Sequence, residues 1–248
     1  MGPLDLAFRS LSGRGRLPPL WLRRHAGPVS NFESASRETA AYLRQTNLLR
    51  TDAHVLDMGC GPGAMALELA PLLGPAGRYT GFDVHRPSVR WCMRRFAADP
   101  RFRFEAVDVA TPWSRRAEGP PDSLRFPAED GQTDLALAKS FFTHLLEPEA
   151  RRCLTEIRRV LAPGGAAFLT AFLFREGGAT PFFPYPGNGA LVRWRSGARP
   201  QAAVAYARAL FSSMVEEAGL RVRGIHEGFW PGDTNRMTGQ DILILERG

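Results

Sequence analysis

The stretch VLDMGCGPGA, residues 55–64, decides the fold class of this chain. It places an aspartate after an apolar run and then three glycines at alternate positions, which the interior of a helix or strand does not tolerate. In a turn from a strand to a helix, such glycines let the backbone approach a ligand, and the helix directs its N–H groups toward it. The stretch predicts a bound nucleotide-like cofactor; the alternative is a glycine turn without a ligand.

Apolar residues along the chain alternate between the period of strands and the period of helices. The predicted strands cover residues 54–58, 78–84, 102–109, 133–138 and 166–174. The predicted helices cover residues 36–49, 64–73, 88–97 and 147–161. Strands and helices that repeat in this way predict an α/β fold built on a parallel sheet.

Residues 176–200 interrupt this alternation. The segment is too aromatic for a plain linker and too rich in proline and glycine for regular structure, so we expect a lid or cap. A helix at about 200–218 and strands at 221–230 and 240–247 complete the chain. Two strands so close in sequence most simply pair antiparallel.

The length of 248 residues favours one compact domain, which we expect at 36–248 after a basic N-terminal arm, rich in proline, glycine and arginine, at 1–35. A transit-type leader is the alternative for this arm. No apolar run approaches the roughly 18 residues of a membrane helix. The three cysteines form no CxxC pair and follow no secretory signal, which predicts reduced thiols and a cytoplasmic protein.

The net charge of +7 and the pI near 10.1 raise the question of nucleic-acid binding. Lys139 is the only lysine among 32 basic residues, and arginine, alanine, glycine and proline abound together. A GC-rich coding bias produces this composition without selection for RNA. The charge is therefore weak evidence for a nucleic-acid partner.

Aspartates end three successive predicted strands, at Asp57, Asp83 and Asp108. Ligands of parallel α/β sheets bind at this edge, and Asp83 lies 20 residues after Gly63, where a carboxylate can accept both hydroxyls of a ribose. A dinucleotide oxidoreductase also fits, because its glycine pattern is satisfied in the same loop. Asp57 and Asp108 have the alternative roles of capping the turn and ending a strand.

With these motifs the sequence resembles the class I S-adenosylmethionine-dependent methyltransferases, of the small-molecule, methyltransferase type 11-like kind. The family has an acidic residue two positions before its glycines, as Asp57 is here, which the dinucleotide fingerprint does not require. The resemblance covers about residues 36–175 and extends loosely to the end. Its further matches are GFDV at 81–84, VDV at 107–109, the segment 126–145 and EIRRVLAPGG at 156–165.

The resemblance implies a Rossmann-like fold, with a seven-stranded, mostly parallel sheet whose last strand is antiparallel and with helices on both faces. It implies S-adenosyl-L-methionine as cofactor and S-adenosyl-L-homocysteine as product. The glycines would face the methionine moiety, Asp57 would lie near its ammonium group or organise the loop, Asp83 would hold the ribose, and Asp108 the adenine. The cofactor residues so expected are Asp57, Gly59, Cys60, Gly61, Gly63, Asp83, Val84, His85, Asp108, Val109 and Lys139.

Methyl transfer from a sulfonium is an in-line displacement, so positioning supplies much of the catalysis and a base is optional. If the acceptor is a hydroxyl or an amine, a histidine can take its proton. His144, just beyond the fourth strand, is the predicted catalytic base. Its alternative role is to cap the helix that begins near Glu147. The other candidate bases are His226, His25 and Asp233.

Aromatic residues gather where the acceptor would bind, in the insert at 176–200 and after the fourth strand. They can sandwich a flat substrate, or they can form a hydrophobic plug over the sheet. The predicted substrate-binding residues are Phe141, Phe142, Tyr185, Trp194 and Trp230, with Phe182 and Phe183 beside them. Arginines of the insert, Arg193, Arg195 and Arg199, could grip a carboxylate or phosphate of the acceptor, or form a solvated rim.

These observations predict a methyltransferase that acts on a small molecule, with O-methylation ahead of N- or C-methylation. We expect no metal, since no set of metal-ligating residues has ligand spacing. The sequence AKSFF at 138–142 stands where nucleic-acid base methyltransferases often carry an NPPY-type motif. The alternatives are an RNA or protein methyltransferase, supported by the arginine-rich segment 9–24, and a non-catalytic S-adenosylmethionine-binding protein. The sequence does not fix the oligomeric state.

Overall fold

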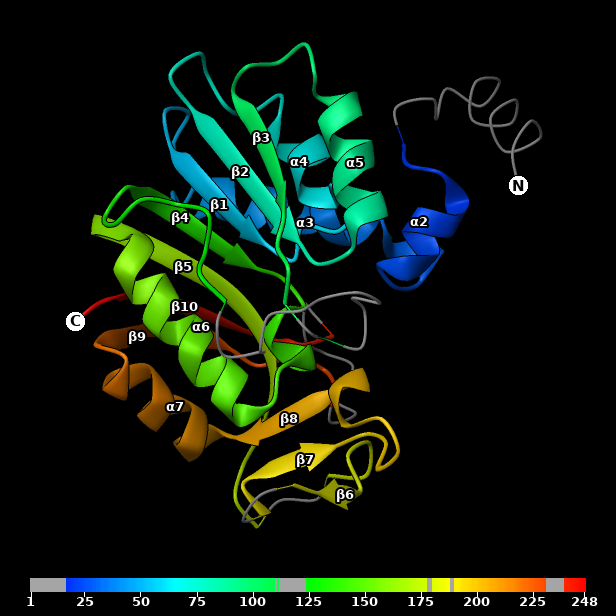
Figure 1. Ribbon diagram of the computed structural model, residues 1–248. Helices are drawn as coiled ribbons and strands as arrows, with labels where there is room; N and C mark the ends of the chain where they lie inside the picture. The colour runs from blue at the N-terminus through cyan, green and yellow to red at the C-terminus, as the bar shows by residue number, and fades with distance from the viewer. Residues whose placement is uncertain (1–16, 110, 112–123, 178–179, 188–189, 231–238) are drawn as a thin grey trace. The chain divides into compact units, whose positions relative to one another are not determined.

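The computed structural model describes residues 17–109, 111, 124–177, 180–187, 190–230 and 239–248. The chain has a mixed α/β structure and divides into two compact units, residues 1–107 and 108–248 (Figure 1). Each unit has its own strands and helices. The expected α/β fold class is confirmed.

The first unit is built on three parallel strands. They are β1 (His54–Met58), β2 (Arg78–Asp83) and β3 (Phe102–Ala106). The strand β2 lies between the other two, with Leu56 of β1 opposite Thr80 and with Phe82 opposite Glu105 of β3. The three strands confirm the sequence prediction, except that β2 and β3 end a little earlier than expected.

Three helices accompany these strands, namely α3 (Ser34–Gln45), α4 (Ala64–Leu69) and α5 (Arg86–Arg95) (Figure 1). Each helix buries an apolar side, and Leu43, Leu69 and Val89 are at most 1% exposed. The helix α4 stops at Leu69, before the predicted residue 73. Pro71 explains the early end, because a proline has no N–H to donate to the carbonyl of Leu67, four residues earlier.

The N-terminal segment also has regular structure where it is described. Residues Leu20–His25 form the helix α2, and Val29–Asn31 form a 3-10 turn, η2. Pro19 and Pro28 stand directly before these two elements, where their missing N–H groups cost no hydrogen bond. Residues 1–16 of the predicted arm lie outside the described residues.

The second unit contains the long strand β5 (Leu161–Phe174), with β4 (Thr133–Ala138) parallel to it. The strand β10 (Asp241–Arg247) runs antiparallel both to β5 and to β9 (Leu220–His226). The predicted antiparallel last strand is therefore confirmed. The helix α6 (Glu147–Val160) packs against β5, and α7 (Arg208–Glu217) lies beside α6 and β9 (Figure 1).

Two expectations for the segment after β5 were wrong. Residues 176–200 were expected to lack regular structure, yet β6 (Tyr185–Pro186) and β7 (Val192–Trp194) pair antiparallel within them. The helix expected at 200–218 begins only at Arg208. It is preceded by the 3-10 turn η6 (Pro200–Ala202) and by β8 (Val204–Ala207), which pairs with β5 and β7.

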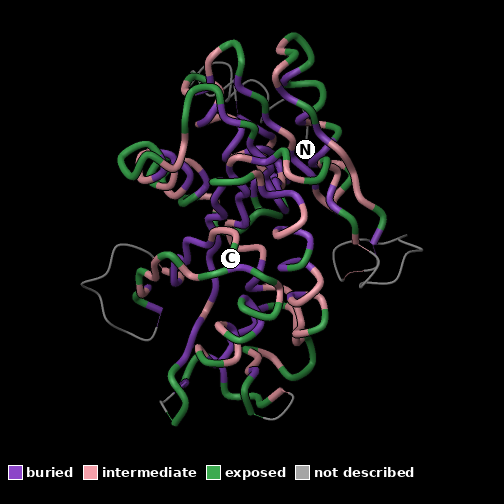
Figure 2. The backbone as a smooth tube through the Cα atoms, turned by 90° about the vertical axis from the view of Figure 1, so that its left-hand side faces the viewer, coloured by how far each residue is buried: buried purple, intermediate pink, exposed green. Residues whose placement is uncertain are grey.

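The described residues therefore form ten strands, where seven were expected, and the three additional ones are β6, β7 and β8. The backbone of β8 pairs on both sides, and all four of its residues are buried, so tertiary pairing overrode the helical pattern. Figure 2 shows the buried residues concentrated inside each unit. In the part of the chain that the structure describes, no helix has the length and apolar character needed to cross a membrane.

Candidate cofactor and acceptor sites

The glycine loop after β1 adopts left-handed backbone at Gly59, Gly61 and Gly63, with φ of 68°, 51° and 79°. A Cβ on Gly63 would lie 2.9 Å from Sγ of Cys92, so this glycine also allows α5 to pack against the loop. A Cβ on Gly61 would approach only Ala26, at 3.8 Å. The loop thus offers an open stretch of backbone at Gly61, which a side chain would fill.

Asp83, at the end of β2, ties the loop to the strand. The Gly61 N–H donates to Oδ2 of Asp83 and the His85 N–H donates to Oδ1, each at 2.7 Å. Each carboxylate oxygen has a second lone pair, so both can still accept a hydroxyl group. Val84 lies half-buried between these partners, and the N–H of Cys60 donates to the Phe82 carbonyl at 3.0 Å. This geometry fits the predicted contact with a ribose.

Asp57 is buried, at 3% exposure, and accepts a hydrogen bond from the hydroxyl of Tyr79 on β2. Burial, and then the charge of Asp57, raise the pKa of Tyr79 well above its ordinary value, so the phenol stays protonated and donates. Asp57 therefore joins β1 to β2 at the base of the loop. The sequence analysis missed Tyr79, and nothing in its pattern distinguishes it from other inward-facing strand residues.

Two buried thiols flank the glycine loop. Sγ of Cys60 lies 3.7 Å and Sγ of Cys92 lies 3.6 Å from the Gly61 carbonyl oxygen. The hydrogen bond with Cys92, followed by burial, raises the pKa of the Cys60 thiol well above its ordinary value. Cys60 is therefore an uncharged packing residue beneath the loop.

Residues of α2 lie against the same loop. The His25 ring stacks on the His85 ring with centroids 3.7 Å apart, and Trp21 meets His85 edge-on at 6.5 Å. The Ser88 hydroxyl lies 2.8 Å from Nδ1 of His85. Burial, and then His25, lower the pKa of His85, although Asp83 opposes this shift. The sequence analysis weighed His25 only as a base and did not anticipate this stack.

The remaining predicted cofactor residues belong to the second unit. Val109 is buried, Asp108 is exposed and Lys139 is half-buried. Ser140, directly after Lys139, has a left-handed φ of 57°, an unfavourable conformation for a residue with a side chain. The Ser140 N–H donates to the hydroxyl oxygen of Thr170 at 2.7 Å, and the Ser140 hydroxyl donates to Oε1 of Gln240 at 3.1 Å. Strain held in place by such bonds is typical of functional loops.

His144 ends the 3-10 turn η4 (Phe142–His144), and its Nδ1 lies 3.0 Å from the carbonyl oxygen of Gln201. Burial lowers the pKa of His144, while the carbonyls of Gln201 and Ala202 oppose the shift. In the neutral ring, a proton on Nδ1 that donates to Gln201 leaves the lone pair on Nε2. This is the tautomer that a base acting through Nε2 requires.

Glu149 occupies the helix-start position that was the alternative role of His144. Its Oε2 accepts the Leu146 N–H at 2.7 Å and so satisfies the N-cap backbone donor at the start of α6. Both oxygens of Glu149 also lie 2.9 Å from Nε2 of Gln201. The carboxylate therefore fixes the residue whose carbonyl holds His144. The sequence analysis did not anticipate the link between this helix start and η6.

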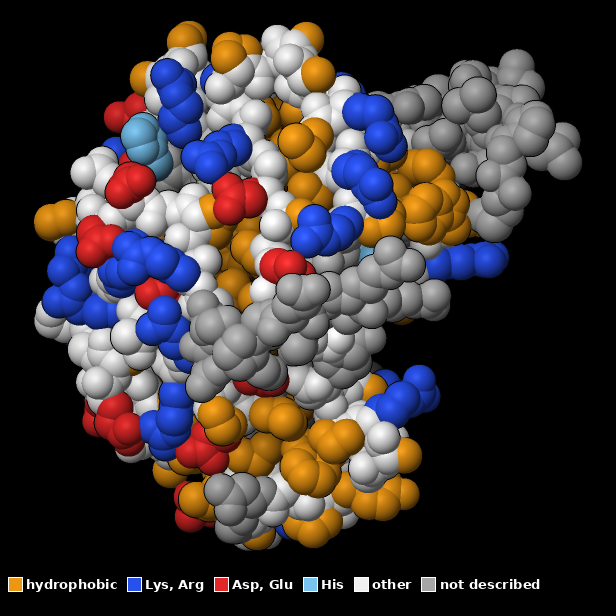
Figure 3. Space-filling model, viewed as in Figure 1, with side chains coloured by type: hydrophobic (Ala, Val, Ile, Leu, Met, Phe, Trp, Pro, Cys, Tyr) orange, Lys and Arg blue, Asp and Glu red, His pale blue; other side chains and the backbone are white. Residues whose placement is uncertain are grey.

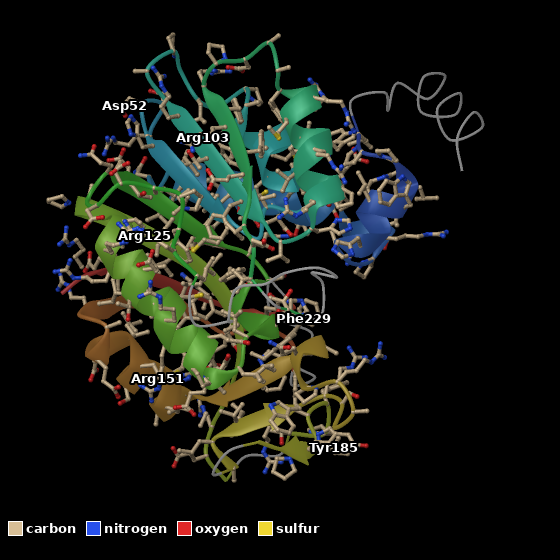
Figure 4. All side chains as sticks on the ribbon, viewed as in Figure 1. Asp52, Arg103, Arg125, Arg151, Tyr185 and Phe229 are labelled. Carbon is tan, nitrogen blue, oxygen red and sulfur yellow. The ribbon has the colours of Figure 1, made fainter. Side chains whose placement is uncertain are left out.

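The predicted aromatic residues fall into two groups. Phe142 is fully buried and meets Phe211 edge-on at 5.6 Å, and the buried Trp230 donates from Nε1 to Asp241 at 2.7 Å. By contrast, Tyr185 on β6 is 49% exposed (Figure 4). Phe141 and Trp194 are half-buried.

Apolar side chains gather on the surface over β6 and β7 (Figure 3). Their exposed members are Phe182, Tyr185 and Leu191. The Arg193 guanidinium lies 5.8 Å from the centre of the Phe174 ring, and its buried Nε lacks a hydrogen-bond partner among the described residues. The insert therefore contains both a buried aromatic cluster and an exposed apolar rim. Asp233 lies outside the described residues.

Comparison with known proteins shows what this chain is similar to. Residues 55–165 match the family model described as a methyltransferase domain. The uncharacterized 37.1 kDa protein in transposon TN4556 of Streptomyces fradiae is 32% identical over 152 residues, which are 54% of this chain and 39% of that protein. Demethylmenaquinone methyltransferase of Lactiplantibacillus plantarum is 30% identical over 116 residues, 47% of this chain and 44% of the enzyme. The matched stretch thus spans less than half of the length of either relative.

Among solved structures, geranyl diphosphate C-methyltransferase of Streptomyces coelicolor A3(2), in complex with Mg²⁺, geranyl diphosphate and S-adenosyl-L-homocysteine, has the same fold. Its TM-score is 0.56 at 15% identity, over 85% of this chain and 78% of that one. The shared fold and the match of residues 55–165 agree with the resemblance to class I S-adenosylmethionine-dependent methyltransferases that the sequence shows.

Proposed function

We propose that this methyltransferase transfers the methyl group of S-adenosylmethionine to a hydroxyl group of a small molecule, with His144 as the general base. The observation that carries the proposal is the 3.0 Å hydrogen bond between Nδ1 of His144 and the Gln201 carbonyl. A ring held in this way has its basic nitrogen at Nε2, as abstraction of a hydroxyl proton requires. The demethylmenaquinone methyltransferase relative, whose name specifies a small acceptor, supports the acceptor class.

S-adenosylmethionine, when bound, would supply an electrophilic methyl group on a sulfonium. The sulfur would keep the electrons of the broken C–S bond and leave as a neutral thioether. In the proposed site the glycine loop would hold the amino-acid end of the cofactor and Asp83 its ribose. His144 takes the acceptor proton as the oxygen attacks, so that the nucleophile gains negative charge without forming a free alkoxide. Orientation of acceptor and donor supplies the rest of the rate acceleration.

Acceptor recognition is assigned to the insert and to Phe141. The exposed rings of Phe182 and Tyr185 offer apolar surface for a flat or hydrocarbon-rich molecule. The buried, unpartnered Nε of Arg193 favours an acceptor with a carboxylate or phosphate. We propose the same class of ligand for Trp194, whose indole nitrogen is also buried without a partner among the described residues.

The acceptor class is tested with S-adenosylmethionine labelled on its methyl group, incubated with the protein and a cell extract that is separated into small-molecule, RNA and protein fractions. The expected result is label in a small molecule that can be extracted. A treatment that cleaves methyl groups from amines should not remove this label. Label confined to RNA or protein would instead establish the alternative acceptors, and absence of label with retained cofactor binding would indicate a non-catalytic binding protein.

The role of His144 is tested with His144→Ala, which we expect to lower kcat by about 10²- to 10⁴-fold and to leave S-adenosylhomocysteine affinity unchanged. Because burial lowers the pKa of His144, the acidic limb of the pH profile of kcat/KM should lie below about pH 6.5. Glu149→Gln should shift this limb through Gln201, whereas the matched variant Glu147→Gln, which removes an ion pair with Arg151, should not. An unchanged kcat in His144→Ala would contradict the assignment.

A further inference from the structure

The helix α2 is part of the wall of the glycine loop. Ala26, directly after α2, is the residue that a Cβ on Gly61 would meet, at 3.8 Å, and its N–H donates to the Arg23 carbonyl at 3.1 Å. The stack of His25 on His85 holds the same helix against the end of β2. Arg23 therefore stands one helical turn from the open backbone of the loop.

Arg23 is an unusual residue to find in such a wall. It is only 6% exposed, and its Nε is buried without a hydrogen-bond partner among the described residues. Burying a guanidinium nitrogen without an acceptor is unfavourable, so this position calls for a partner that the described residues do not supply. An arginine side chain is long enough to cross one helical turn to the loop.

The charges around the loop indicate the chemistry of that partner. Asp57 and Asp83 make the loop acidic, which suits the ammonium group and ribose of the cofactor but not its carboxylate. Arg37 pairs with Glu68 at 3.9 Å, and Arg24 is exposed. Arg23 is thus the buried cation of the described wall, and its planar fork matches a carboxylate.

We propose that Arg23 binds the carboxylate at the amino-acid end of S-adenosylmethionine, and that α2 is therefore a cofactor-binding element. In the loaded protein the carboxylate supplies the acceptor that Nε of Arg23 lacks. The cofactor in turn ties α2 to the glycine loop, in addition to the contacts of His25 and Ala26. The inference rests on the cofactor and is independent of the proposed acceptor and of His144.

The test is titration calorimetry of S-adenosylhomocysteine and of its decarboxylated analogue, which keeps the ammonium group and lacks only the carboxylate. The wild-type protein should bind S-adenosylhomocysteine about 10- to 100-fold more tightly than the analogue, as expected for charge-assisted hydrogen bonds. Arg23→Met should lower the affinity for S-adenosylhomocysteine by a similar factor and leave that for the analogue unchanged. Arg24→Met, which removes the exposed neighbouring charge, should leave both affinities unchanged.

Equal weakening of both ligands in Arg23→Met, or no weakening, would overturn the proposal. If Arg23→Met does not fold, as judged by circular dichroism, then Arg23→Lys serves instead, because it keeps the charge and loses the fork. The ratio of the two affinities should then fall below the wild-type ratio; an unchanged ratio would count against Arg23. Activity toward any acceptor does not enter this measurement, so its outcome is separate from that of the labelling experiment.

Discussion

The glycine loop of the first unit and the His144 region of the second unit are assembled in different ways. The loop, Asp57, Asp83 and His85 come from 31 consecutive residues, 55–85, so that one strand–helix–strand passage carries most of their chemistry. His144 depends on Gln201, 57 positions later, and Gln201 depends on Glu149, 52 positions earlier. A site of the first kind can be predicted from a short motif, whereas one of the second kind requires the tertiary structure.

The two regions also differ in how they hold polar groups. At the loop, strand ends and left-handed glycines place backbone N–H groups against a carboxylate. In the second unit, side chains from distant elements fix a strained turn at Ser140 and the ring of His144. The loop should therefore respond mainly to changes of backbone conformation. The second region should respond mainly to loss of packing and of side-chain hydrogen bonds.

The largest expected effect is on packing of the insert. Phe183 is 2% exposed and packs against Phe172 and Trp230, with ring centres 5.0 and 5.5 Å away. Phe183→Ala should lower the free energy of unfolding by about 3–5 kcal/mol, measured by urea denaturation. Its neighbour Phe182 is 52% exposed, so Phe182→Ala should change that free energy by less than about 0.5 kcal/mol. Equal losses in the two variants would contradict the description of the insert.

The next effect concerns the glycine loop. Gly63→Ala should lower the free energy of unfolding by about 1–3 kcal/mol through left-handed backbone strain, and by about 1–3 kcal/mol more through overlap with Cys92. Gly164 has nearly the same φ, 78°, and a Cβ there would meet nothing within 4 Å. Gly164→Ala is therefore the control that contains the strain alone. If the two variants lose the same stability, packing of α5 on the loop does not require Gly63.

A pair of buried tyrosines compares the two regions directly. Tyr79 donates to the Asp57 carboxylate, and Tyr206 donates to the Leu145 carbonyl before α6. Tyr79→Phe should cost about 1–3 kcal/mol of stability and weaken binding of S-adenosylhomocysteine, because a buried carboxylate loses a donor. Tyr206→Phe should leave cofactor affinity unchanged. Calorimetric titration of both variants decides whether Asp57 organises the loop.

The smallest expected effect is on pH dependence. Because burial and His25 lower the pKa of His85, the unfolded chain binds more protons than the folded one just below pH 6.5. The stabilisation is thus fully present above the unfolded pKa and is lost as the pH falls through the folded pKa. The protection factors of the α2 amides in hydrogen exchange, which are corrected for the intrinsic pH dependence of exchange, should therefore fall below about pH 6.5, and His85→Gln should weaken this dependence. Protection factors that do not vary with pH would show that the stack does not hold α2.

Several local features could be predicted from the sequence. The boundaries of β1 and β4 follow from short apolar runs beside turn residues, and the antiparallel last strand agrees with the family resemblance. The insert was harder to predict, because β8 pairs with β5, where Ala205 lies opposite Phe172, 33 positions earlier in the sequence. Proline and glycine in 176–200 lower local propensity, but they do not prevent the backbone from pairing with β8.

By itself, the sequence predicted the α/β fold class and the glycine turn between a strand and a helix. These follow from neighbouring residues whose backbone conformations and charges act over a few positions. Only the tertiary structure decided that Tyr79 pairs with Asp57, that Glu149 and Gln201 hold His144, and that the α2 segment brings His25 and Ala26 to the loop. The physical reason is that burial and hydrogen-bond partners depend on which distant segments pack together, and a local pattern does not contain that information.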